Sequence, residues 1–165
     1  MKPLIKICGI AEKDNLIQLT KIEKIDFLGF IFYEHSLRNA TIDFVNSISH
    51  VDFKNKRPVC VYVNADKEFV EETSSYFVNP ILQFHGDETN TFCKSFKKDF
   101  WKVIRVKDAE SIKLVNDYPD ASGILFENYE TGIYGGTGNS FNWNLMNNIK
   151  DLDIKIILSG GINIK

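Results

Sequence analysis

Short apolar runs recur along the chain, and each is about five to seven residues long, the usual length of a β-strand. They begin near Leu4, Asp26, Arg57, Ile81, Trp101, Gly123 and Ile154. Between them, apolar residues repeat at the three- or four-residue steps of an amphipathic helix. Three such series are Leu16, Leu19 and Ile22; Ile42, Val45 and Ile48; and Phe92, Phe96 and Phe100. Thr41 and Asp108 are expected to cap helix N-termini.

The alternation of strands and helices predicts βαβ units with a parallel sheet, in a single domain over residues 1–165. The architecture could be an open doubly wound sheet or a closed (β/α)8 barrel. The first strand-to-helix turn, residues 8–11, has no GxGxxG pattern, which disfavours a dinucleotide-binding sheet. Polar residues mark the carboxyl ends of five predicted strands, at Cys8, Asn64, His85, Glu127 and Ser159. A barrel gathers such ends on one rim, where barrel enzymes have their active sites.

Composition narrows the possible functions. The chain has 165 residues, 44% hydrophobic and 25% charged, with a net charge of -2 and no basic block, so nucleic acid is not an expected partner. No apolar run is long enough to span a membrane. The three cysteines form no CxxC pair and the three histidines are scattered, which disfavours disulfides and metal sites. A reducing cytoplasm is the expected location, and the sequence leaves the oligomeric state open.

Cys8 is the strongest candidate for chemistry. It ends an apolar run and precedes Gly9, which can turn the chain sharply. Lys6 lies two positions earlier and shares a strand face with Cys8, and a nearby ammonium favours the thiolate. The alternative is a small buried hydrophobe, the common role of a free cysteine. Cys60, within a strand, and Cys93, on a helix, are expected to be structural.

Glu127 closes the apolar run 123–126, so we expect its carboxyl group to be partly desolvated and suited to donating a proton. The alternative is an exposed loop carboxylate, a description that fits Glu130 better. Arg38 follows the second strand and could hold a carboxylate, or be a solvated surface residue. His85 could bind substrate or be a satisfied histidine at the edge of the core.

Two glycine-rich segments suggest a phosphate site. Backbone N–H groups of residues 134–138 could wrap a phosphosugar, although such a loop can also be a flexible turn. Residues 159–161 follow the seventh strand, and the loop there often binds phosphate in barrels. The candidates for contact with substrate are Lys6, Arg38, His85, Gly135, Gly136, Gly138, Ser159, Gly160 and Gly161.

An ordered set of motifs resembles the phosphoribosylanthranilate isomerase family of tryptophan biosynthesis. The motifs are Lys6-Ile7-Cys8-Gly9-Ile10, Gly29-Phe30 with Ser36 and Arg38, Val61-Tyr62-Val63-Asn64, Gln83-Phe84-His85-Gly86, Tyr134-Gly135-Gly136-Thr137-Gly138 with Phe141 and Trp143, and Leu158-Ser159-Gly160-Gly161. The resemblance implies a (β/α)8 barrel without metal or cofactor. It also implies an Amadori rearrangement of N-(5-phosphoribosyl)anthranilate to 1-(2-carboxyphenylamino)-1-deoxyribulose 5-phosphate.

The resemblance assigns roles to individual residues. Cys8 would be the general base, and Glu127 would be the general acid at a position where the family has aspartate. Arg38 would bind the anthranilate carboxylate, and Gly160 and Gly161 would bind phosphate. The chain ends at Lys165 before a seventh helix, eighth strand and eighth helix, so the barrel is expected to be incomplete by roughly 35 to 45 residues.

Two other functions stay open at this point. An incomplete barrel could be catalytically impaired and act only as a binding or association module, because its terminal strands would have unpaired edges. The chain could also be another phosphosugar-binding barrel enzyme, such as a relative of indole-glycerol-phosphate synthase. Cys8 and Glu127 disfavour that enzyme, whose ring closure usually depends on lysine and glutamates.

Overall fold

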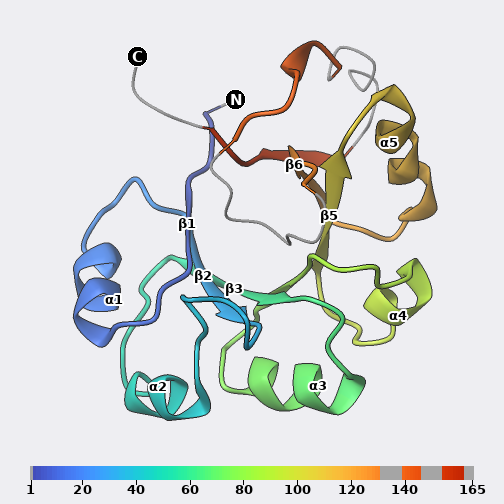
Figure 1. Ribbon diagram of the computed structural model, residues 1–165. Helices are drawn as coiled ribbons and strands as arrows, with labels where there is room; N and C mark the ends of the chain where they lie inside the picture. Colours follow the sequence, from blue (N-terminus) through green and yellow to red (C-terminus); the bar gives the residue numbers. More distant parts are fainter. Residues whose placement is uncertain (1, 131–138, 146–153, 162–165) are drawn as a thin grey trace. The chain divides into compact units, whose positions relative to one another are not determined.

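The computed structural model describes residues 2–130, 139–145 and 154–161 (Figure 1). Strands and helices alternate through this part of the chain. They are β1 (Lys6–Cys8), α1 (Lys13–Thr20), β2 (Phe27–Phe32), α2 (Ile42–Ser47), β3 (Arg57–Tyr62), α3 (Lys67–Ser75), β4 (Ile81–Phe84), α4 (Asn90–Lys94), β5 (Phe100–Val106), α5 (Ala109–Lys113), the 3₁₀ helix η1 (Leu114–Asp117), β6 (Gly123–Asn128) and β7 (Lys155–Leu158). The described residues therefore contain a strand at each of the seven predicted apolar runs.

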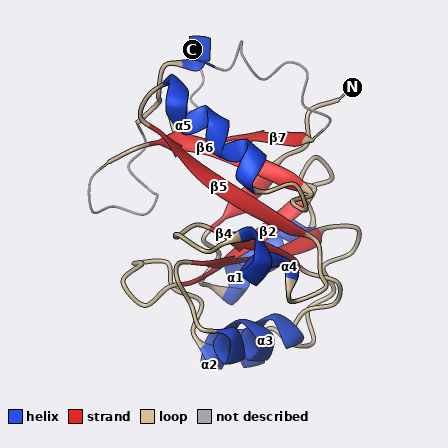
Figure 2. Ribbon diagram, turned by 90° about the vertical axis from the view of Figure 1, so that its right-hand side faces the viewer, coloured by secondary structure: helices blue, strands red, loops and turns tan. Residues whose placement is uncertain are grey.

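The chain forms two compact units, Met1–Gln83 and Phe84–Lys165. In the first unit β1, β2 and β3 are parallel neighbours in chain order, with Gly29 beside both Cys8 and Val59. One face of β2 and β3 packs against a cluster of aromatic rings that includes Phe30 and Phe77, whose centroids are 4.7 Å apart. Helices α2 and α3 lie side by side in both views of this unit (Figures 1 and 2).

In the second unit β5, β6 and β7 are parallel neighbours, again in chain order. Their register places Arg105 beside Glu127. Figure 2 shows α5 lying across β5 and β6, where Ile112 packs with Ile104 and Phe126 in a buried apolar cluster. Burial of this cluster leaves the opposite face of β5 and β6, which carries Glu127, for polar chemistry.

The predicted helix caps are confirmed. The Thr41 side chain accepts a hydrogen bond from the Phe44 backbone N–H at the start of α2. Asp108 caps α5 in a capping box with Ser111, and these bonds lower the pKa of Asp108 below its usual value. Each cap satisfies an N–H group that the first helical turn leaves without a backbone partner.

The phenylalanine series was wrong as a helix prediction. Helix α4 ends at Lys94, Lys97 has a positive φ of 53°, and Phe100 begins β5. The spacing reflects an aromatic cluster, in which the rings of Phe92, Phe96 and Phe100 lie around Phe84. Helix α1 similarly ends at Thr20, before Ile22. None of the helices in the described ranges has the length and apolar character needed to cross a membrane.

Candidate active site

The thiol of Cys8 lies beside an amine. Cys8 ends β1 and shares a face with Lys6, as the alternation of a strand requires. The Lys6 Nζ donates to Cys8 Sγ at 3.0 Å and to Gln83 Oε1 at 2.9 Å. Gln83 is buried, and its carbonyl oxygen holds the amine against the sulfur. The predicted placement of Lys6 next to Cys8 is confirmed, whereas the part played by Gln83 was missed.

Gly29 provides the space for this pair. It is the β2 neighbour of Cys8, and a Cβ at this position would lie 2.8 Å from Cys8 Sγ and 3.0 Å from Lys6 Cε. The first of these distances is too short for atoms not bonded to each other, so a larger residue would displace the thiol or the amine. Gly29 is therefore the residue that lets Lys6 and Cys8 meet.

Gly29→Ala should slow the alkylation of Cys8 by iodoacetamide at pH 7 by about tenfold, because the thiolate is the nucleophile and loses its ammonium neighbour. Mass spectrometry of the Cys8 peptide would measure the rate. Gly123→Ala is a matched control, since its Cβ would lie 2.8 Å from the Trp101 side chain of the second unit. An unchanged rate in Gly29→Ala would show that the pair tolerates the added methyl group.

Arg38 is tied to the same strand end. Its Nη1 donates to the backbone carbonyl of Cys8 at 3.0 Å. Its side chain crosses Gly9, where φ is +84° and a Cβ would lie 2.8 Å from Arg38 Cδ. The residue is exposed, yet its guanidinium is held at the carboxyl end of β1. This arrangement places a guanidinium, a group that can bind a carboxylate, next to the strand end that carries the thiol.

In the second unit, Glu127 forms a close pair with His85. The distance from His85 Nε2 to Glu127 Oε1 is 2.5 Å, and the side chains are 10% and 8% exposed. Glu130 is less buried and accepts a hydrogen bond from Asn139. The prediction that Glu127 is the desolvated carboxyl group is confirmed. Both residues were candidates from the sequence, but the contact between them was not predicted.

The glycine-rich segments are only partly described. Gly135, Gly136 and Gly138 lie outside the described residues. Gly160 and Gly161 both have positive φ, +82° and +65°, and a Cβ on Gly160 would lie 2.6 Å from the carbonyl oxygen of Asn139. Ser159 continues β7 by donating its N–H to Phe126. These glycines allow two backbone segments to approach closely, a geometry that can also present N–H groups to an anion.

Two ion pairs in the second unit were not predicted from the sequence. Lys102 and Glu88 make a buried pair of 2.8 Å with side chains 3% exposed, whereas Arg105 pairs at 3.2 Å with Asp87, whose side chain is 68% exposed. The available signal was the position of Lys102 inside the apolar strand 100–106, since a lysine there needs a buried partner.

The other two cysteines are structural, as predicted. Cys60 and Cys93 are fully buried, and none of the three cysteines forms a disulfide. Burial raises the pKa of the Cys93 thiol to about 12, so it stays protonated and unreactive near neutral pH. Cys8 differs because it is partly exposed and has the Lys6 amine as a neighbour.

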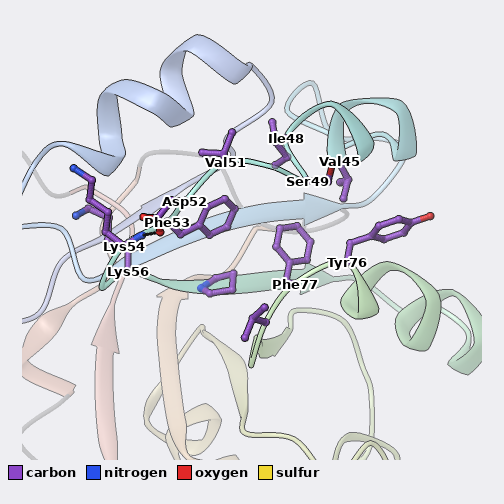
Figure 3. A pocket seen from close by; sticks show the side chains of 12 residues that line it. Val45, Ile48, Ser49, Val51, Asp52, Phe53, Lys54, Lys56, Tyr76 and Phe77 are labelled. Atoms are coloured by element: carbon purple, nitrogen blue, oxygen red, sulfur yellow. Dashed lines mark hydrogen bonds between the residues drawn. The ribbon is translucent and has the colours of Figure 1, made fainter.

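A cavity of about 310 Å³ lies in the first unit, away from Cys8 (Figure 3). Its walls include Val45 of α2 and Ile48 just after that helix, and the rings of Phe53 and Phe77 lie along it. It also reaches Pro58, near the amino end of β3. In parallel α/β folds, catalytic groups gather at the carboxyl ends of the strands, so this cavity is a packing feature between the segment 45–58 and residues 76–78.

Comparison with known proteins identifies the family. A family model described as N-(5'phosphoribosyl)anthranilate (PRA) isomerase matches residues 5–165. The N-(5'-phosphoribosyl)anthranilate isomerase of Nitrosomonas europaea is 37% identical over 164 residues, which cover 99% of this chain and 76% of the relative. The protein of that name from Marinomonas sp. is 35% identical, covering 96% of this chain and 76% of its own length.

Solved structures of the same family resemble this chain in fold. Phosphoribosyl anthranilate isomerase from Thermotoga maritima matches with a TM-score of 0.82 and 25% identity over 98% of this chain and 78% of that one. A phosphoribosyl anthranilate isomerase in complex with reduced 1-(o-carboxyphenylamino)-1-deoxyribulose 5-phosphate shares the fold, with a TM-score of 0.79 at 24% identity over 98% and 77% of the two chains. The predicted (β/α)8 class is confirmed, with seven strands in the described part. The chain thus belongs to the N-(5'-phosphoribosyl)anthranilate isomerase family.

Proposed function

We propose that this chain is an isomerase of tryptophan biosynthesis that converts N-(5-phosphoribosyl)anthranilate to 1-(2-carboxyphenylamino)-1-deoxyribulose 5-phosphate. The observation that carries the proposal is the environment of Cys8, whose thiol contacts the Lys6 amine and whose carbonyl accepts a bond from Arg38. An aldose-to-ketose rearrangement needs a base for one carbon-bound proton. A thiolate supported by an ammonium is such a base.

Glu127 acts first, as the acid. Its carboxyl group gives a proton to the ring oxygen of the ribose, the C1–O bond breaks, and the nitrogen lone pair forms the Schiff base. His85, at 2.5 Å, fixes the carboxyl group in place. Burial of Glu127 suits this role because it keeps bulk water away from the carboxyl group that would donate the proton.

Cys8 acts second, as the base. The thiolate removes the proton from C2, and the electrons of the C–H bond form a C1–C2 double bond while the Schiff base nitrogen becomes neutral. The resulting enol gains a proton at C1 and loses the one on its C2 oxygen, which gives the ketone product. Both catalytic residues lie at carboxyl ends of parallel strands, and a (β/α)8 fold collects these ends around one substrate.

The remaining predicted residues bind the substrate. Arg38 would hold the anthranilate carboxylate with guanidinium N–H groups, and Lys6 and His85 would contact the sugar while supporting the catalytic groups. Gly160 and Gly161, together with the segment containing Gly135, Gly136 and Gly138, would hold the phosphate through backbone N–H groups, and Ser159 would donate its hydroxyl. We also propose a cytoplasmic location, which is supported by three cysteines that form no disulfide.

Turnover of N-(5-phosphoribosyl)anthranilate by the purified 165-residue chain tests the proposal. We expect conversion well above that of the Cys8→Ser variant under the same conditions. If the folded chain shows no such difference, the isomerase proposal is wrong for this chain. Equilibrium binding of the reduced product analogue would then separate two outcomes, because a binding module retains affinity for it whereas an unrelated barrel enzyme does not.

A further inference from the structure

Lys102 and Glu88 form a buried ion pair around a single backbone residue, Gly86. The Lys102 Nζ donates to the Gly86 carbonyl at 2.6 Å and to Glu88 Oε2 at 2.8 Å. The other carboxylate oxygen, Glu88 Oε1, accepts from the Gly86 N–H at 3.3 Å. Both polar groups of one peptide residue are therefore held by two charged side chains, which we term the Gly86 clamp.

Tyr118 of the adjoining segment completes the surroundings of the clamp. Its hydroxyl donates to the Glu88 backbone carbonyl at 2.9 Å, and the Lys102 amine lies 5.4 Å from the centre of its ring. Burial raises the pKa of Tyr118 to about 12, so its hydroxyl remains a donor. The turn 86–88 is thus fixed by a charge pair, a cation–π contact and a hydroxyl.

Stability alone is a poor explanation for this pair. Both side chains are 3% exposed, and removing two charges from water costs about as much as their attraction returns. Apolar residues of similar volume would fill the same space equally well. What an apolar pair could not do is hold the N–H and carbonyl of Gly86 in one orientation.

Gly86 directly follows His85, and His85 contacts Glu127 at 2.5 Å. A rotation of the Gly86 peptide would therefore turn the imidazole and move the carboxyl group that it holds. We propose that Lys102 and Glu88 are positioning residues, which orient His85 and through it the proton of Glu127. This inference rests on the proposed function for its catalytic consequence, although the His85–Glu127 contact can be measured without turnover.

The test is the double variant Lys102→Met with Glu88→Met, since either single change would leave an unpaired buried charge and impair folding. The imidazole ¹⁵N and ¹H signals of His85 should shift away from those of the unmodified chain, while His35 and His50 keep theirs. The kcat should fall by about 10- to 100-fold with KM within about threefold, as misplacement of a catalytic group predicts.

One further variant serves as a comparison. Lys113→Met with Glu110→Met removes an exposed ion pair of 2.7 Å from α5 and should change neither.

The inference is overturned if the folded clamp variant retains the His85 signals, or if its kcat is unchanged despite shifted signals. Shifted His85 signals in a chain that never turns over N-(5-phosphoribosyl)anthranilate would support the positioning of His85 and refute the proposed function instead. Signals and kcat that change equally in the α5 control would also refute the inference, because any loss of paired charge would then have the same effect.

Discussion

Replacing Cys8 with serine should lower the kcat for N-(5-phosphoribosyl)anthranilate by about 10³-fold, within the range of general base catalysis. A serine hydroxyl has the same shape but holds its proton far more tightly than a thiol, so the contact with Lys6 at 3.0 Å no longer yields a base. KM should stay within about threefold, because Arg38 and the phosphate-binding residues are unchanged. Steady-state rates at several substrate concentrations would measure both.

Cys60→Ser is the matched control for this change. Cys60 lies in β3, fully buried and on the opposite face of the sheet from Val59, so it does not contact the proposed site. Its substitution should affect stability more than kcat, once the rates are corrected for the folded fraction. Equal losses of kcat in both variants would contradict the role of Cys8 as base. A small loss in Cys8→Ser alone would assign the C2 proton to another residue.

The strands could be predicted from sequence because each contains a short apolar run, and the strands β2 to β6 are largely buried. The parallel order followed from the alternation with helices, and the caps at Thr41 and Asp108 followed from local chemistry. The phenylalanine series failed for a physical reason: Phe84 gathers Phe92, Phe96 and Phe100 from a helix, a turn and a strand. Periodicity detects a shared apolar environment, and it does not reveal that the helix ends at Lys94, before the positive φ of Lys97.

The site was predicted where its residues are close in sequence or belong to a recognisable motif. Lys6 and Cys8 are two positions apart, so strand alternation alone placed them together. Gln83 and Lys6 are 77 positions apart in the sequence, and Glu127 and His85 are 42 apart. Whether such residues meet depends on the register between strands. Register is set by packing over the whole sheet, and a single sequence does not encode it locally. The Gly86 clamp was missed for the same reason.

Glu127→Gln should lower kcat by about 10²- to 10⁴-fold, the contribution expected of a general acid. The amide keeps the size of the side chain and can still hydrogen-bond to His85, but it has no proton to give to the ribose ring oxygen. Because the position of Arg38 does not depend on Glu127, affinity for the reduced product analogue should change by less than about threefold. Calorimetry with that analogue and steady-state turnover would test the two parts separately.

Glu127→Asp shows whether the site has adjusted to the longer acid. Aspartate, the residue that the resembled family has at this position, still carries a proton but is one methylene shorter, so it cannot keep the 2.5 Å contact with His85 without movement of the backbone. A displacement of about 1 Å predicts a loss of kcat on the order of 10²-fold, smaller than the largest loss expected for glutamine. Full activity in Glu127→Asp would mean that the acid works without the contact to His85. That result would contradict the His85–Glu127 pair as a catalytic unit, and it would also contradict the inference that the Gly86 clamp positions Glu127 through His85. A loss as large as that of Glu127→Gln would instead show that proton donation depends entirely on the geometry that glutamate and His85 set together.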